Sequence, residues 1–264
     1  MTNSSIPLRR VVVAAGLAVS AFLAGCSTPA AVSRTNPSTA GGSVPPGEVI
    51  ESDVPDGAVG SGVYARRVED YRANPAFAQS HQRRILYADA LLHLGRARAA
   101  IDVLIETEIA FPDAYLNALY LGLAYEIAGD LRMARHWVAR TIERNVDARG
   151  GSEWLHLAML DARIALARDP SWLKTRSVLA NNTHRTAEAI LEAIRIQLAV
   201  RGDFGLPVDM VICDLYFEAG VCASGAAARQ GYFARSLEIG SLRRGEIERH
   251  GRITARAHAS VQVH

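Results

Sequence analysis

The 264-residue sequence predicts an all-α protein, on three observations. Aromatic residues make up only 6% of a chain that is 49% hydrophobic, and a β-sandwich needs strands rich in aromatic and β-branched residues. Two segments carry matching residue types at a constant offset and at helical spacing, and residues 185–200 place apolar side chains on one helical face. The formal net charge of +2 argues against a nucleic-acid-binding protein, which usually presents a strongly basic face.

The N-terminal segment, residues 1–25, has the layout of an export signal. Arg9 and Arg10 precede an uncharged apolar run over residues 11–25. As a helix this run would span about 22 Å, less than the roughly 30 Å hydrocarbon core of a bilayer, so it predicts a signal h-region rather than a membrane-spanning helix. The run ends in Leu23-Ala24-Gly25-Cys26, which resembles the lipobox of bacterial lipoproteins. The alternative is an ordinary secretory signal with a chance cysteine.

The lipobox resemblance implies that the signal peptide, residues 1–25, is removed and that Cys26 carries covalent lipid, a diacylglycerol and an acyl chain such as palmitate. Ser27, rather than aspartate, follows the cysteine, which by analogy with enterobacterial lipoproteins suggests the outer membrane, with the protein facing the periplasm. Residues 26–60 are rich in Pro, Gly, Ser and Thr and show no periodicity, so we expect a flexible linker. Its reach would be about 30–35 Å.

An internal repeat organises the next part of the chain. Glycines at the expected helix ends and small or apolar residues within the helices recur at one offset, in the pairs Gly95 and Gly129, Ala100 and Ala134, Leu104 and Val138, Ala88 and Gly122, and Leu91 and Tyr125. This pattern resembles tetratricopeptide (TPR) repeats, which have a period of about 34 residues. The resemblance, to poorly characterised bacterial TPR lipoproteins, implies that residues 61–240 form helical hairpins stacked as a short solenoid.

A partial third copy begins at residues 153–168, which we expect to be helical, and residues 169–174 then interrupt the repeat. Residues 185–200 form an amphipathic helix in which Ala187, Leu191, Ile194 and Leu198 share one face, with Ile190 on its flank.

Residues 202–207 break that helix. We expect residues 208–219 to form the next helix, ended by Gly220, and residues 226–239 to pair with it as a degenerate fourth hairpin. The arginine-rich residues 241–264 are expected to be frayed.

Motifs that carry chemistry are missing from the sequence. It contains no His-Glu-x-x-His, Cys-x-x-Cys, Gly-x-Ser-x-Gly or phosphate-loop pattern, so we expect no metal, no cofactor beyond the lipid on Cys26, and no enzyme activity. The acid/base candidates Glu153, Asp161 and Asp169 are expected at helix surfaces. Cys213 and Cys222 could be bridged only after a sharp reversal of the chain, and two small buried side chains are the favoured interpretation.

A recognition surface remains as the candidate site. In TPR proteins the first helix of each repeat lines a concave groove, and the matching residues here are Gln82, Ile85, Asp89, Leu92 and His93, followed by Leu116, Leu119, Leu123 and Glu126. The second set is mostly apolar, which suits a helix or an extended peptide. These leucines could instead be covered by the C-terminal hairpin.

The sequence therefore favours a membrane-anchored, non-enzymatic scaffold or adaptor that docks an envelope protein or peptide, does not bind nucleic acid, and could self-associate. The alternative is an envelope small-molecule or glycan-binding protein, or an enzyme, with a pocket between the repeat pair and the C-terminal hairpin, near Lys174.

Overall fold

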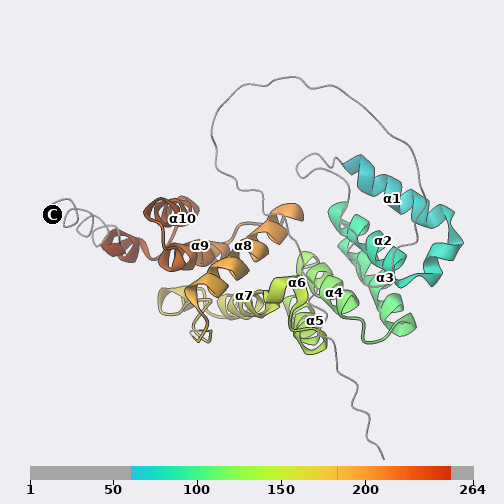
Figure 1. Cartoon of the computed structure of the whole chain (residues 1–264), viewed down its shortest axis with the longest axis horizontal. Helices are drawn as coiled ribbons and strands as arrows, with labels where there is room; N and C mark the ends of the chain where they lie inside the picture. Colours follow the sequence, from blue (N-terminus) through green and yellow to red (C-terminus); the bar gives the residue numbers. More distant parts are fainter. Residues whose placement is uncertain (1–60, 183, 251–264) are drawn as a thin grey trace, which may run out of the picture. The chain divides into compact units, whose positions relative to one another are not determined.

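The computed structural model describes residues 61–182 and 184–250, and every regular element within them is helical (Figure 1). The all-α prediction is confirmed for this part of the chain. The expected signal peptide, Cys26, the linker and residues 251–264 lie outside the described residues. None of the described helices is long and apolar enough to cross a membrane.

The first helices form two hairpins with the same dimensions. After α1 (Ser61–Ala73) and a 3-10 turn (Pro75–Gln79) come α2 (His81–His93), α3 (Ala97–Ala110), α4 (Tyr115–Ile127) and α5 (Leu131–Arg144). Both ends of α4 and of α5 follow the matching ends of α2 and α3 by the same offset that separates Gly95 from Gly129. The spacing found in the sequence is therefore the spacing of the two hairpins.

The turn inside each hairpin needs a left-handed glycine. Gly95 has a φ of +70° and Gly129 a φ of +84°, a region that residues with a Cβ rarely adopt. The hydrogen bonds also match, since the amides of Arg96 and Asp130 donate to the carbonyls of Leu91 and Tyr125. These bonds satisfy carbonyls at the end of α2 and of α4.

Small residues let the paired helices approach closely. A Cβ on Gly122 would lie 2.7 Å from Cγ2 of Val138, too close for any real contact. Ala100 and Ala134, equivalent residues of α3 and α5, have no exposed surface. Small residues that recur in the internal repeat therefore lie where the helices pack against each other.

The repeat pattern changes after α5. A short turn of helix, α6 (Ala148–Gly151), contains left-handed backbone at Arg149 and leads into α7 (Glu153–Leu166), which packs against α5. A second 3-10 turn (Trp172–Lys174) and a loop precede α8 (Ala187–Asp203). An apolar core joins α7, the residues 173–179 and α8 to the next helix, α9 (Met210–Cys222).

The buried face of α8 differs from the predicted stripe. Ile190, Ala193, Ile194, Gln197 and Arg201 are buried. Of the predicted stripe only Ile194 is fully buried, while the side chains of its other members are exposed or half-buried. The buried face differs from the predicted one because Gln197 binds Ser152, in the turn before α7, and Arg201 binds Glu126 of α4.

The helices α9 and α10 pack against each other as a hairpin, and α10 (Ala226–Ile239) has the predicted bounds. Gly220, predicted to end α9, lies inside that helix. A Cβ there would lie 2.4 Å from the ring of Phe233, so the glycine permits close contact with α10.

The prediction of a frayed C-terminus is wrong for residues 241–250. Residues 244–250 are helical, and Ile247 is buried against Phe217 and Phe233. Arg243 forms an ion pair with Asp214 at 3.2 Å. An apolar contact and an ion pair therefore hold this segment on the α9–α10 hairpin.

Candidate functional site

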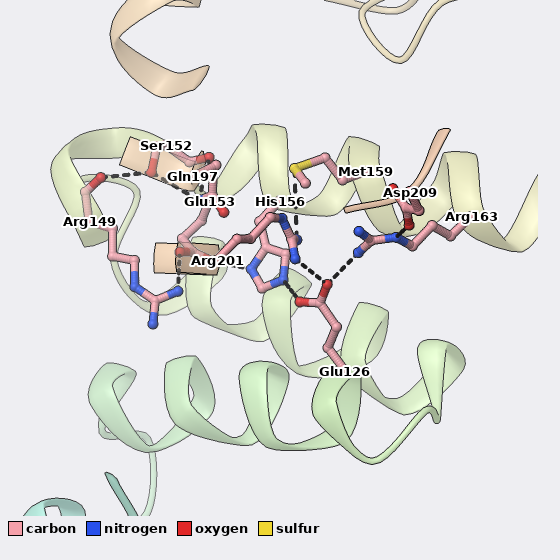
Figure 2. Close-up of polar contacts among 10 residues, drawn as sticks. All are labelled: Glu126, Arg149, Ser152, Glu153, His156, Met159, Arg163, Gln197, Arg201 and Asp209. Atoms are coloured by element: carbon pink, nitrogen blue, oxygen red, sulfur yellow. Dashed lines mark hydrogen bonds and ion pairs between the residues drawn. The ribbon is translucent and has the colours of Figure 1, made fainter. Parts of the chain in front are cut away.

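A buried polar cluster lies where α4, α7 and α8 meet (Figure 2). At its centre is Glu126 of α4, whose side chain is only 3% exposed. Its carboxylate accepts hydrogen bonds from His156 Nε2 at 2.7 Å, from Arg201 Nη1 at 2.7 Å, and from Arg163 Nη1. One carboxylate thus connects three helices that are distant in sequence.

A second carboxylate lies on the other side of the histidine. Glu153, also on α7, is 1% exposed and contacts His156 Nδ1 at 3.0 Å. Arg149 Nη1 donates to Glu153 at 3.2 Å. Because both ring nitrogens of His156 face carboxylate oxygens, the geometry suits an imidazolium that donates to both.

The cluster extends to the start of α9 and to the middle of α8. Arg163 Nε donates to Asp209 Oδ2 at 2.6 Å, while Asp209 Oδ1 caps α9 by accepting from the Val211 and Ile212 amides. Gln197 Nε2 donates to Ser152 Oγ at 3.1 Å. The polar contacts therefore join the hairpins to the C-terminal helices.

The titration behaviour follows from burial and from these contacts. Burial alone would raise the pKa of Glu126, but His156, Arg201 and Arg163 outweigh it and hold the pKa far below its ordinary value. The pKa of Glu153 is likewise lowered, since Arg149 and His156 overcome its burial. Burial would lower the pKa of His156, but the two glutamates raise it above 6.5.

These shifts favour a structural role over acid/base chemistry. A general base needs an available lone pair and a pKa near the working pH. His156 has both nitrogens engaged, and Glu126 and Glu153 are held as weak bases by their cationic neighbours. The arrangement is suited to holding helices in one register rather than to moving protons.

The predicted groove residues Asp89 and His93 lie under other parts of the chain. The His93 ring is stacked between Tyr64 of α1, at 4.0 Å between centroids, and Phe204, at 4.2 Å. Its Nε2 lies 3.6 Å from Asp89 and 3.8 Å from Asp203. Burial raises the pKa of Asp89, and the nearby His93 and Arg67 only partly offset it.

Most of the other groove residues are not available at a surface. Ile85, Leu92, Leu119, Leu123 and Glu126 are buried, Leu116 is half-buried, and Gln82 is exposed. Residues around the end of α8 pack on the core of the first hairpins, namely Val200, Phe204 and Leu206. The stated alternative was that the C-terminal hairpin covers the leucines. Of these, Leu123 belongs to the core of the first hairpins, and the residues from later in the chain that pack on this core lie around the end of α8 rather than on α9 or α10.

The acid/base candidates divide between buried and exposed positions. Glu153, expected at a helix surface, is buried, because Arg149 and His156 supply its charge partners. Asp161 and Asp169 are exposed as expected: Asp161 pairs with Arg135 at 2.5 Å, and Asp169 accepts from the Ser171 amide at 2.9 Å.

The missed feature had a signal in the sequence. Glu126 is the only charged residue of the helix YLNALYLGLAYEI. A single charge inside an apolar helix is rarely buried without a partner, so it indicates a charge on another element. The pairing with Arg201 joins residues 75 positions apart, which no local pattern shows.

The other candidate sites give weaker indications of function than the polar cluster. Cys213 and Cys222 are free thiols on α9, and Cys213 Sγ contacts the Ser236 carbonyl at 3.2 Å. Within residues 61–182 and 184–250, no group of three His, Cys, Asp or Glu side chains could hold a metal ion. A hollow of about 500 Å³ lies at the α4–α5 turn, beside Ile164 and Arg168, and Lys174 does not line it.

No protein-family model, curated protein or solved structure matches this chain.

Proposed function

We propose that this chain is a lipid-anchored, TPR-like scaffold that docks a protein partner in the bacterial cell envelope. The observation that carries the proposal is the constant offset between the two hairpins, with the same glycine turn in each and a fully buried alanine, Ala100 or Ala134, at the matching position of the second helix. That period and those residue types are typical of a repeat whose usual work is protein recognition. The sequence around Cys26 supports the anchor and, through Ser27, the outer membrane.

We expect the docking surface at the start of the first helix of each hairpin. Gln82 and Leu116 occupy equivalent positions of the repeat at the start of α2 and of α4, where Gln82 is exposed and Leu116 is half-buried. Changing Leu119 or Leu123 to glutamate would put a carboxylate into the core and unfold the hairpin, so those positions cannot test docking.

The anchor is tested by changing Cys26 to Ser in cells fed a labelled fatty acid. We expect the wild-type chain to carry the label and to sediment with membranes, and Cys26→Ser to lose both properties while the helical body stays folded. Cys213→Ser is the matched control and should keep label and location. Wild-type protein found unlabelled in the soluble periplasm would overturn the anchor.

Docking is tested by crosslinking in cells, followed by mass spectrometry of the proteins captured. We expect one envelope protein to be enriched by the wild type and lost when Gln82 and Leu116 are both changed to Glu. Leu242→Glu is the control, because that leucine is 51% exposed and lies in the C-terminal segment. Enrichment of no protein across several growth conditions would refute the scaffold and direct the search to small ligands or glycans.

A further inference from the structure

The helix α8 has two halves that make different contacts. In the first half Ile190, Ala193 and Ile194 lie in the apolar core shared with α7 and α9. In the second half the buried side chains include Gln197 and Arg201, which bind polar groups. The first half therefore holds α8 in the core that it shares with α7 and α9. The second half adds the polar contacts of Gln197 and Arg201 to the packing of Val200 on the core of the first hairpins.

The second half of α8 lies on the surface expected to receive a partner. We name residues 197–206 the covering segment. Arg201 binds Glu126 of α4 at 2.7 Å, and Figure 2 draws this contact. Phe204 stacks on His93 of α2. Glu126 and His93 are both groove residues by the TPR pattern. The chain thus occupies this part of its own groove with a helix end.

The covering segment contains two glycines, which the part of α8 before it lacks. Gly202 lies in its last turn, and Gly205 follows with a φ of +60°, so two glycines flank the ring that contacts His93. Glycine weakens a helix end because it gains the most freedom when the helix frays.

The polar contact of Arg201 is also incomplete. Arg201 Nε is buried and has no hydrogen-bond partner among the described residues. Desolvation cancels much of the attraction within a buried ion pair, so the contact between Arg201 and Glu126 adds less stability than its 2.7 Å distance suggests.

We propose that the covering segment is an internal competitor for the docking groove, and that a partner helix displaces it. The partner would carry the same chemistry: an arginine for Glu126, followed three positions later by an aromatic ring for His93. This inference rests on the proposed docking function and adds to it that the wild-type scaffold is self-closed.

The test uses a fluorescent synthetic peptide with the sequence of residues 187–209, added to the full chain. The wild type should bind it weakly, and Phe204→Ala should bind it roughly tenfold more tightly, because loss of a stacked ring weakens the internal competitor. Phe77→Ala, which truncates a half-buried ring elsewhere, should bind like the wild type. A peptide carrying Arg201→Glu should not bind. Equal binding by Phe204→Ala and the wild type would overturn the proposal.

Hydrogen exchange of the wild type gives a second measurement that needs no variant. Amides of residues 197–206 should exchange at least roughly tenfold faster than those of α4 and α7, because the segment opens locally. Exchange of all three at the rate of global unfolding would overturn the proposal.

Crosslinking in cells separates this inference from the function it rests on. Phe204→Ala should capture more of the docking partner than the wild type. Capture of equal amounts would overturn self-closure and leave the scaffold standing. Peptide displacement with no partner captured would support the covering segment and refute the scaffold.

Discussion

The change of Glu126 to Gln tests the central ion-pair cluster. The carboxylate accepts from His156, Arg201 and Arg163, and a glutamine has only one oxygen to offer them. An oxygen in the place of Oε1 could still accept from both arginines, but the amide nitrogen in the place of Oε2 would face the donor His156 Nε2, and the buried cations would lose their counter-charge. Removing one partner of a buried ion pair costs about 3–5 kcal/mol. At about 2–4 °C per kcal/mol for a body of this size, Tm should fall by about 6–20 °C.

Urea denaturation followed by helical circular dichroism measures this loss, with Asp161→Asn as the matched control. Asp161 also pairs with an arginine, Arg135, but the two side chains are 50% and 46% exposed. A solvent-exposed pair is worth about 0–1 kcal/mol, so the control should change little. If Glu126→Gln costs no more than Asp161→Asn, the cluster does not hold the helices together.

The packing and the titration shifts give three further predictions. Gly122→Ala should cost about 1–3 kcal/mol in the free energy of unfolding because its Cβ would meet Val138, whereas Gly231→Ala, which meets nothing within 4 Å, should not destabilise. The pKa of His156 is raised above 6.5, so its contribution to stability is complete below that pH and is lost as the pH rises through the pKa of the folded state. His156→Gln should remove this loss of stability at high pH, which urea titrations at several pH values would measure. Burial raises the pKa of the Cys213 thiol, so a thiol reagent should label it in urea but hardly at all in the native protein; rapid native labelling would contradict its burial.

The glutamates set the acid side of the same stability curve. Because the pKa values of Glu126 and Glu153 are lowered, their contribution is present above the ordinary carboxyl pKa of 4.5 and lost as pH falls toward the folded values. The cluster should therefore stabilise the fold most between about pH 4.5 and pH 6.5. Above this range the contribution of His156 persists until the pH reaches its raised pKa.

The helices of the repeat could be predicted because their signals are local. A left-handed glycine follows the end of α2 at Gly95 and of α4 at Gly129, and small, fully buried residues recur at matching positions of the two hairpins. The bounds of α10 were predictable for the same reason. Gly220 shows the limit of this reasoning: glycine serves both helix ends and close helix contacts, and only the position of Phe233 decides between them.

The face of α8 could not be predicted because hydropathy assigns polar residues to solvent. By that rule Gln197 and Arg201 are assigned to the solvent-exposed face, and the predicted buried stripe runs through Leu191 and Leu198 instead. The rule fails here because α4 already carries Glu126 in an otherwise uncharged helix, and a buried carboxylate requires a cation. Either Glu126 or Arg201 would be costly to bury without the other, whereas at 2.7 Å the two charges stabilise each other.

The same reasoning explains why the predicted groove is covered. A groove residue that is charged and flanked by apolar residues is as consistent with an internal partner as with an external one. Glu126 has three internal cations, and His93 has rings on both sides. Gln82 and Leu116, by contrast, lie where α2 and α4 begin, away from the covering segment's contacts with Glu126 and His93 near the helix ends. A partner of the proposed self-closed form is therefore expected at the start of these helices, and the proposed displacement would make their ends accessible as well.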